Sequence, residues 1–134
     1  MKHLNKQYVR WDDIDAFGHV NNAKYLVMAQ EARFHWSFEQ FEGREERPSI
    51  VEMVVARAEV DFIEPIYEGG IYVDVNLWIE KIGTSSFVMI YEISANEVLY
   101  ARIKSVQVAV SMVSKKSRPL NEAEREFLNK YLEN

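Results

Sequence analysis

The residues that could carry chemistry are concentrated in a short polar stretch near the start of the chain, residues 11–25. It holds three carboxylates, a glycine, a histidine and two asparagines: Asp12, Asp13, Asp15, Gly18, His19, Asn21 and Asn22. A strongly apolar run follows at once, so we expect a loop that leads into a buried helix. A carboxylate can attack a carbonyl carbon or activate water, and free N–H groups at a helix N-terminus can stabilise an oxyanion. These residue types in this order indicate acyl chemistry.

A predicted helix, from residue 21 or 22 to about residue 41 or 42, positions this loop. Asn21 or Asn22 can cap it, because an asparagine side-chain oxygen accepts hydrogen bonds from the first free backbone N–H groups. Gly43 is expected to end it. From residue 23 to residue 29 nearly the whole circumference is apolar, which predicts a helix that is buried on most sides.

The other elements are predicted mostly as strands joined by tight turns. Strand patterns lie at about residues 3–11, 51–62, 71–80, 87–93 and 98–113. Residues 43–48 form a charged loop by composition, and Asn121 can cap a terminal helix over residues 121–133. Hairpin connections imply antiparallel pairing. We therefore expect residues 1–134 to form a single α+β domain, with one long central helix wrapped by a curved antiparallel sheet of about five strands, and a short C-terminal helix.

Composition excludes several kinds of function. The 134 residues include no cysteine, which rules out disulfides, thiolate nucleophiles and cysteine-based metal sites. The histidines lack a metal-binding spacing, so no metal is expected. A net charge of −5 argues weakly against a nucleic-acid partner, which needs a basic face. No stretch approaches the about 20 apolar residues of a membrane helix, and no signal peptide follows Met1, so a cytoplasmic location is the default expectation.

The strands between residues 71 and 113 carry apolar residues on both faces. Val88 and Ile90, for example, alternate with Phe87 and Met89. A single helix can cover only one face of the sheet. We therefore expect the other face to meet a second subunit.

The polar stretch and its surroundings resemble the hotdog-fold acyl-CoA thioesterases, specifically the 4-hydroxybenzoyl-CoA thioesterase-like group. The resemblance is carried first by Asp13-Ile14-Asp15-Ala16-Phe17-Gly18-His19-Val20-Asn21-Asn22, followed by Tyr25. It continues in Glu31-Ala32-Arg33, in Asp61-Phe62 to Pro65, in Gly69, and in Ile82-Gly83 with Ser85-Ser86-Phe87. It covers about residues 7–113, nearly the whole domain.

The resemblance implies that Asp15 is the catalytic carboxylate, either as nucleophile or as general base. It implies that backbone N–H groups at the helix start, in about residues 20–22, polarise the thioester carbonyl. Active sites would lie at a dimer interface that holds the acyl-CoA, with dimers often pairing into tetramers, and no metal or prosthetic group would be used. The hydroxybenzoyl substrate is not carried over, because His19 and Asn21-Asn22 replace bulky apolar residues of some members.

The site predicted from these arguments has two sets of residues. The catalytic set is Asp15, His19 and Asn22, and the substrate-binding set is Gly18, Val20, Asn21, Tyr25, Glu31 and Ser86. His19 could orient a water molecule or bond the substrate carbonyl, or it could serve structurally by bonding a backbone carbonyl. Asp13 is interpreted as a structural partner that accepts backbone N–H bonds. Glu31 is the second candidate for a catalytic carboxylate, or else a partner of Arg33.

The function expected from the sequence is hydrolysis of an acyl-CoA to a carboxylic acid and free CoA. Two alternatives stay open: hydrolysis of acyl groups on a carrier protein, and acyl-CoA binding without catalysis, because fold alone does not fix function.

Overall fold

The computed structural model describes residues 1–41 and 49–133; the charged loop predicted at residues 43–48 and the helix stop at Gly43 lie outside them. The strands are β1 (His3–Val9), β2 (Met53–Phe62), β3 (Ile71–Ile82), β4 (Ser86–Ala95) and β5 (Val98–Ala109). The helices are α1 (Asn22–Ser37) and α2 (Glu122–Lys130), and short 3-10 turns occupy Trp11–Asp13, Phe38–Phe41 and Ser49–Val51.

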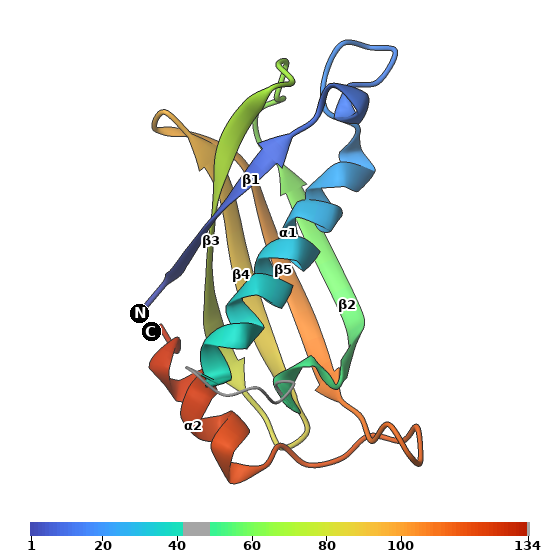
Figure 1. Ribbon diagram of the computed structural model, residues 1–134, viewed down its shortest axis with the longest axis vertical. Coiled ribbons are helices and arrows are strands. Elements are labelled where there is room, and N and C mark those ends of the chain that lie inside the picture. Colours follow the sequence, from blue (N-terminus) through green and yellow to red (C-terminus); the bar gives the residue numbers. More distant parts are fainter. Residues whose placement is uncertain (42–48, 134) are drawn as a thin grey trace.

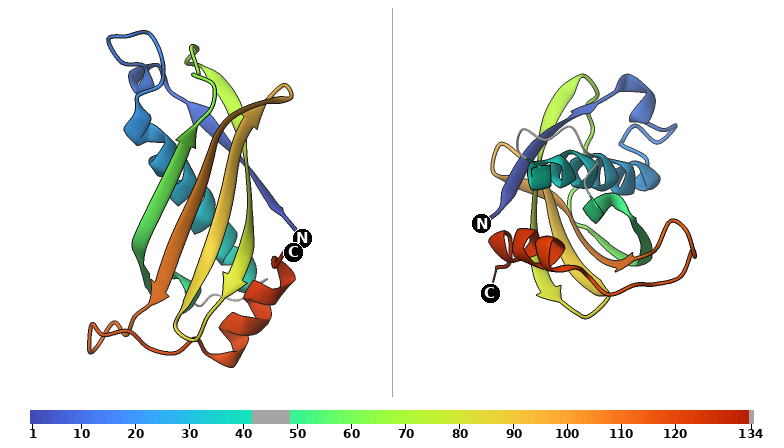
Figure 2. Two further views of the ribbon diagram at one scale, coloured as in Figure 1. Left: turned by 180° about the vertical axis from the view of Figure 1, so that it is seen from behind. Right: turned by 60° about the horizontal axis from the view of Figure 1, so that its bottom comes forward.

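The five strands form one sheet in the order β1-β3-β4-β5-β2, and every neighbouring pair is antiparallel. Helix α1 lies along one face of this sheet, which curves around it (Figure 1, Figure 2). The predicted fold of one long helix, an antiparallel sheet and a short C-terminal helix is confirmed. Strands β1 and β2 are the edges of the described sheet, so one side of β2 has no strand partner among residues 1–41 and 49–133.

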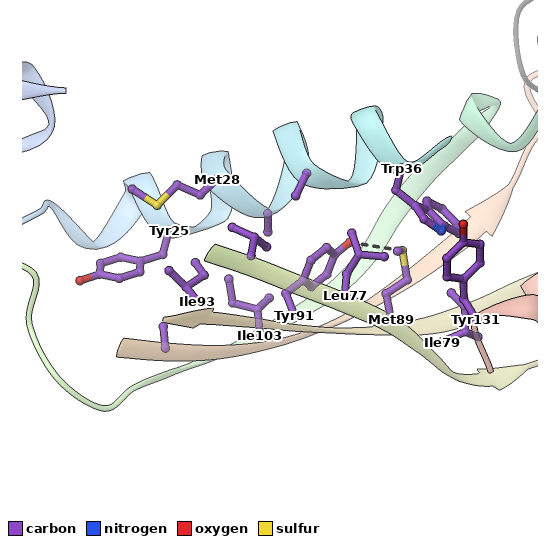
Figure 3. Packing of buried hydrophobic residues seen from close by; sticks show 14 of the residues in the cluster. Tyr25, Met28, Trp36, Leu77, Ile79, Met89, Tyr91, Ile93, Ile103 and Tyr131 are labelled. Carbon is purple, nitrogen blue, oxygen red and sulfur yellow. Dashed lines mark hydrogen bonds between the residues drawn. The ribbon is translucent and has the colours of Figure 1, made fainter. Parts of the chain in front are cut away.

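The core fills the space between α1 and the sheet. The helix contributes Tyr25, Met28, Ala29, Ala32 and Trp36, and the sheet contributes residues such as Leu77, Met89, Tyr91, Ile93 and Ile103 (Figure 3). Trp36 extends this core to α2, because its ring centroid lies 4.9 Å from that of Phe127. Helix α2 is also held by fully buried Glu124, which accepts two hydrogen bonds from Arg118, at 2.8 and 3.0 Å.

The expected burial of α1 on most sides is wrong for the single chain. Leu26 and Val27 are 42% and 49% exposed, although both are apolar. The prediction rested on the composition of the helix, which cannot tell a core formed by one chain from a surface that needs a partner. An apolar side of α1 is therefore left uncovered by the residues that the structure describes.

The outer face of the sheet is covered in part by side chains of the same chain. Trp78 and Ile90 are 8% and 1% exposed, since long charged side chains of the same chain lie over this face. The ammonium of Lys2 lies 4.2 Å from the Trp78 ring centroid, and Lys104 pairs with Glu80 at 2.9 Å. Exposed apolar side chains remain on this face at Leu4, Tyr8 and Tyr72, and others lie on α1 and along β2.

Two predicted elements end earlier than the sequence pattern suggests. Helix α1 gives way to the 3-10 turn at Phe38, and β5 stops at Ala109 although apolar residues continue to Val113. After β5 the chain folds back, with a bridge between Val110 and Ser117 and a positive φ of 62° at Lys115. Hydrophobic periodicity does not report such a reversal.

Candidate active site

The loop between β1 and α1 is built around Asp13, which is 6% exposed. Its Oδ2 accepts the backbone N–H of Arg10 at 2.9 Å, and its Oδ1 accepts the Arg10 guanidinium at 3.2 Å. The ammonium of Lys24, on α1, lies 3.8 Å from the same Oδ1. Asp13 therefore fastens the loop to the start of the helix, which is the structural role predicted for it.

Asp15 sits in the tight turn that follows. Its Oδ1 accepts the backbone N–H of Phe17 at 2.9 Å, and its backbone N–H donates to the carbonyl of His19 at 2.9 Å. Its Oδ2 lies 3.9 Å from His19 Nδ1, and no hydrogen bond to this oxygen is found within residues 1–41 and 49–133. One carboxylate oxygen thus orients the side chain, while the other remains available to a substrate or a water molecule.

Gly18 closes the turn because of its backbone conformation. Its φ is +83°, and its N–H donates to the Asp15 carbonyl at 3.0 Å. A Cβ at this position would meet no atom within 4 Å, so the structure gives no sign of a close approach by another part of the chain. The conformational reason for this glycine is therefore supported.

The start of α1 leaves one backbone donor unused. The Asn21 side chain caps the helix by accepting the N–H of Ala23 at 3.0 Å. The N–H of Val20 donates to the Ile66 carbonyl at 2.8 Å, and that of Asn21 donates to the Asp13 carbonyl at 2.9 Å. No partner for the N–H of Asn22 is found in the described part of the chain. The candidate carbonyl-polarising donor is therefore Asn22, rather than all three residues at the helix start.

A pocket of about 210 Å³ adjoins the loop and the first turn of α1. Its lining consists of His19, Tyr25, Phe62, Ile63, Glu64 and Pro65. We call it the loop pocket. Tyr25 is buried, and its ring meets that of Phe62 edge to face at 5.3 Å. Burial raises the pKa of the Tyr25 hydroxyl above its ordinary value, so this group stays neutral at physiological pH.

His19 fits both interpretations left open by the sequence. Its Nδ1 lies 3.3 Å from the backbone carbonyl of Val20, as a structural histidine would. The same side chain is 40% exposed and lines the loop pocket beside Asp15. It is placed where it can contact a bound carbonyl or water molecule.

A second pocket, of about 450 Å³, lies beside the C-terminal half of α1. Its lining consists of Gln30, Glu31, Arg33, Phe34, Trp36, Ser37, Ile50, Val51, Met53, Val55 and Gln107. We call it the Gln107 pocket. Glu31 lies here and is exposed, nine residues beyond Asn22, which is roughly 14 Å along the helix axis. The Arg33 guanidinium donates to the Tyr91 hydroxyl at 3.0 Å rather than pairing with Glu31.

The structure does not bring Glu31 or Ser86 to Asp15 within one chain. Ser86 begins β4, at the end of the sheet near α2, whereas the Asp15 loop lies at the opposite end (Figure 1).

The sequence reasoning also missed Gln107, whose signal was a polar residue at an inward position of β5. It missed the Ile66 carbonyl as well, for which a backbone group offers no sequence signal.

The described residues contain no group of three or more His, Asp or Glu side chains that could hold a metal ion. Within the same residues, neither helix is long and apolar enough to span a bilayer.

A single helix against a curved antiparallel sheet, with a carboxylate loop at the helix start, defines a hotdog protein with a site suited to acyl chemistry. Residues 9–128 match the model of the thioesterase-like superfamily. A predicted thioesterase from Bacillus stearothermophilus is 28% identical, has a TM-score of 0.87, and is matched over 100% of this chain and 98% of its own. A thioesterase from Thermus thermophilus, complexed with coenzyme A and Zn, is 32% identical with a TM-score of 0.82, over 96% and 92% of the two chains.

A 1,4-dihydroxy-2-naphthoyl-CoA hydrolase from Microcystis aeruginosa is 26% identical over 119 residues, which are 87% of this chain and 85% of that protein. The chain therefore belongs to the thioesterase-like superfamily, and it is a thioester hydrolase.

Proposed function

We propose that the chain hydrolyses acyl-CoA thioesters, with Asp15 as nucleophile or general base. One observation carries this proposal: the open Oδ2 of Asp15 lies 3.9 Å from Nδ1 of His19, which lines the loop pocket, and the backbone N–H of Asn22 is unused at the start of α1. The similar thioesterase from Thermus thermophilus is complexed with coenzyme A, and the similar protein from Microcystis aeruginosa is a CoA-ester hydrolase, which supports a CoA thioester as substrate.

In this proposal the carbonyl oxygen of the thioester accepts a hydrogen bond from the backbone N–H of Asn22. The positive end of the α1 dipole then stabilises the negative charge that develops on this oxygen. As a nucleophile, Asp15 bonds to the carbonyl carbon, CoA leaves as the thiolate, and water hydrolyses the resulting anhydride. As a general base, Asp15 takes a proton from water, the hydroxide adds to the carbon, and CoA leaves as the thiolate. Both routes need the carboxylate ionised and one of its oxygens free.

We propose further that the site is completed by a second copy of the chain. Strand β2 is an edge strand with exposed apolar residues, including Val54, Val55 and Phe62, at 51%, 48% and 54%. Such an edge is a template for pairing with another strand. Antiparallel pairing of β2 with its copy would bring the Phe62 end of one strand to the Met53 end of the other.

That pairing has a direct consequence for the site. Phe62 lines the loop pocket and Met53 lines the Gln107 pocket, so the loop pocket of one subunit would lie beside the Gln107 pocket of its partner. The exposed apolar side of α1 supports the same interface. Asp15 of one subunit would then act on an acyl group held by the other, in a homodimer that can pair into a tetramer.

The proposal is tested by thiol release from a panel of short, medium, long and aromatic acyl-CoAs. Asp15→Asn is expected to reduce turnover by at least about 1,000-fold without unfolding the chain. Asp12→Asn is the matched control and should retain turnover, because Asp12 is 88% exposed at its side chain. Full turnover by Asp15→Asn would refute the role of Asp15. Turnover of acyl-carrier-protein thioesters alone, or binding of acyl-CoA without turnover, would select the corresponding alternative function.

A further inference from the structure

Gln107, one of the residues that line the Gln107 pocket, carries an unpaired polar atom. Gln107 is fully buried, and its Nε2 donates to Ser105 Oγ at 2.7 Å. Its Oε1 has no hydrogen-bond partner among the described residues. Exchanging the amide oxygen and nitrogen would satisfy Ser105 equally well and leave the nitrogen unpaired instead, so one end of the amide stays free in either orientation. A buried polar group without a partner is costly, which points to a ligand that supplies one.

Gln107 is part of a chain of polar side chains under α1. Ser105 Oγ lies 3.3 Å from the Tyr91 hydroxyl, which accepts a hydrogen bond from Arg33 at 3.0 Å. The network therefore begins and ends with Arg33 and Gln107, both of which line the same pocket. A guanidinium has five N–H donors, so Arg33 retains donors beyond the one given to Tyr91.

The lining of the pocket favours a neutral polar group. Its charged side chains are Glu31 and Arg33, whose formal charges cancel. The other lining residues include apolar side chains such as Phe34, Ile50 and Met53, which suit the hydrocarbon part of an acyl group. A hydroxyl matches the polar end, because it can donate a hydrogen bond to the Gln107 oxygen and can also accept one from a neighbouring donor.

We propose that Gln107 is a specificity-determining residue that binds a hydroxyl group at the far end of the acyl chain or ring. The inference rests on the proposed function and on the β2 pairing, which places the Gln107 pocket beside the partner's Asp15 loop. The thioester would lie between that loop and the pocket, with the acyl group pointing to the Gln107 amide. Substrates that lack the hydroxyl would leave this amide unpaired and be hydrolysed less efficiently.

The test uses pairs of acyl-CoAs that differ only by a hydroxyl: benzoyl with para-hydroxybenzoyl, and octanoyl with omega-hydroxyoctanoyl. For the unmodified chain, kcat/KM for the better hydroxylated substrate should exceed that of its partner by at least about 10-fold. Gln107→Met preserves side-chain length but removes both polar atoms, and it should reduce this ratio to within about 3-fold of unity. Gln7→Met makes the same change on β1, at a residue that lines neither pocket, and as the matched control it should leave this ratio unchanged.

Binding measurements separate this inference from the proposed hydrolysis. Dissociation constants of the same pairs are measured with the Asp15→Asn chain, which should bind without turnover and show the same preference. If the hydroxylated acyl-CoAs bind more tightly but the unmodified chain does not turn them over, the proposed hydrolysis of acyl-CoA would be refuted. The proposed binding of a hydroxyl by Gln107 would then still be supported. Equal values for both members of each pair in the unmodified chain would overturn the role of Gln107, whether or not Gln107→Met folds. An unchanged preference in folded Gln107→Met would overturn it too.

Discussion

Replacing Asp13 by alanine removes the carboxylate that holds the site loop to the helix. The Arg10 backbone N–H, bonded to Asp13 Oδ2 at 2.9 Å, would lose its partner in a partly buried position, at a cost of about 1–3 kcal/mol. The Arg10 guanidinium at 3.2 Å adds little, because the Arg10 side chain is 59% exposed and its ion pair is screened by solvent. We therefore expect the free energy of unfolding to fall by about 1–3 kcal/mol, which lowers Tm by roughly 4–12 °C.

Chemical denaturation of Asp13→Ala beside Asp12→Ala measures this difference. Asp12 is the neighbouring carboxylate, 88% exposed and 3.8 Å from the same guanidinium, so its replacement should change stability by less than about 0.5 kcal/mol. Turnover should also fall in Asp13→Ala, since Asp15 depends on the same loop. Equal stabilities for the two variants would refute the structural role of Asp13.

Two further predictions concern the fold around the site. Burial raises the pKa of Glu124, but hydrogen bonds from Arg118 and from the backbone of Asn121 outweigh it and hold the pKa below its ordinary value. The stabilisation is therefore fully present above the unfolded pKa of about 4.3 and is lost as pH falls through the lower folded pKa. Glu124→Gln should lower the free energy of unfolding by about 3 kcal/mol near neutral pH and weaken its dependence on pH below about pH 5. Urea titrations at several pH values measure both effects. An unchanged pH dependence in the acid range would contradict this prediction. Gly18→Ala should lower the free energy of unfolding by only about 1 kcal/mol, measured by chemical denaturation, because the strain of the positive φ is the sole penalty. A decrease above about 3 kcal/mol would contradict this, since it would require a steric clash that the structure does not show.

Much of the fold follows from local sequence signals. The alternation from Ile71 onward predicts β3, and the side-chain caps at Asn21 and Asn121 mark the starts of α1 and α2. The early end of β5 at Ala109 was missed, because a chain reversal through a left-handed residue at Lys115 leaves apolar composition unchanged.

The candidate site was predictable only in part. The resemblance to the hotdog thioesterases distinguishes Asp15 from Asp13, and the hydrogen bonds agree with a structural Asp13 and an available Asp15. Sequence could not show that the N–H groups of Val20 and Asn21 are taken, because their acceptors are backbone carbonyls. The helical rise alone separates Glu31 from the helix start, but the sequence could not show that Glu31 lines the Gln107 pocket, since that depends on how α1 lies on the sheet.

The central claim is that Asp15 of one subunit acts on an acyl group held by its partner. A complementation assay tests it with two variants that are each expected to be inactive: Asp15→Asn, and Val55→Trp, which fills the Gln107 pocket. Random reassociation would make half of the dimers mixed, and each mixed dimer would contain one intact site of two, so turnover should recover to about a quarter of that of the unmodified chain. No recovery, with mixed dimers verified by mass spectrometry, would show that Asp15 and the pocket do not combine across the interface.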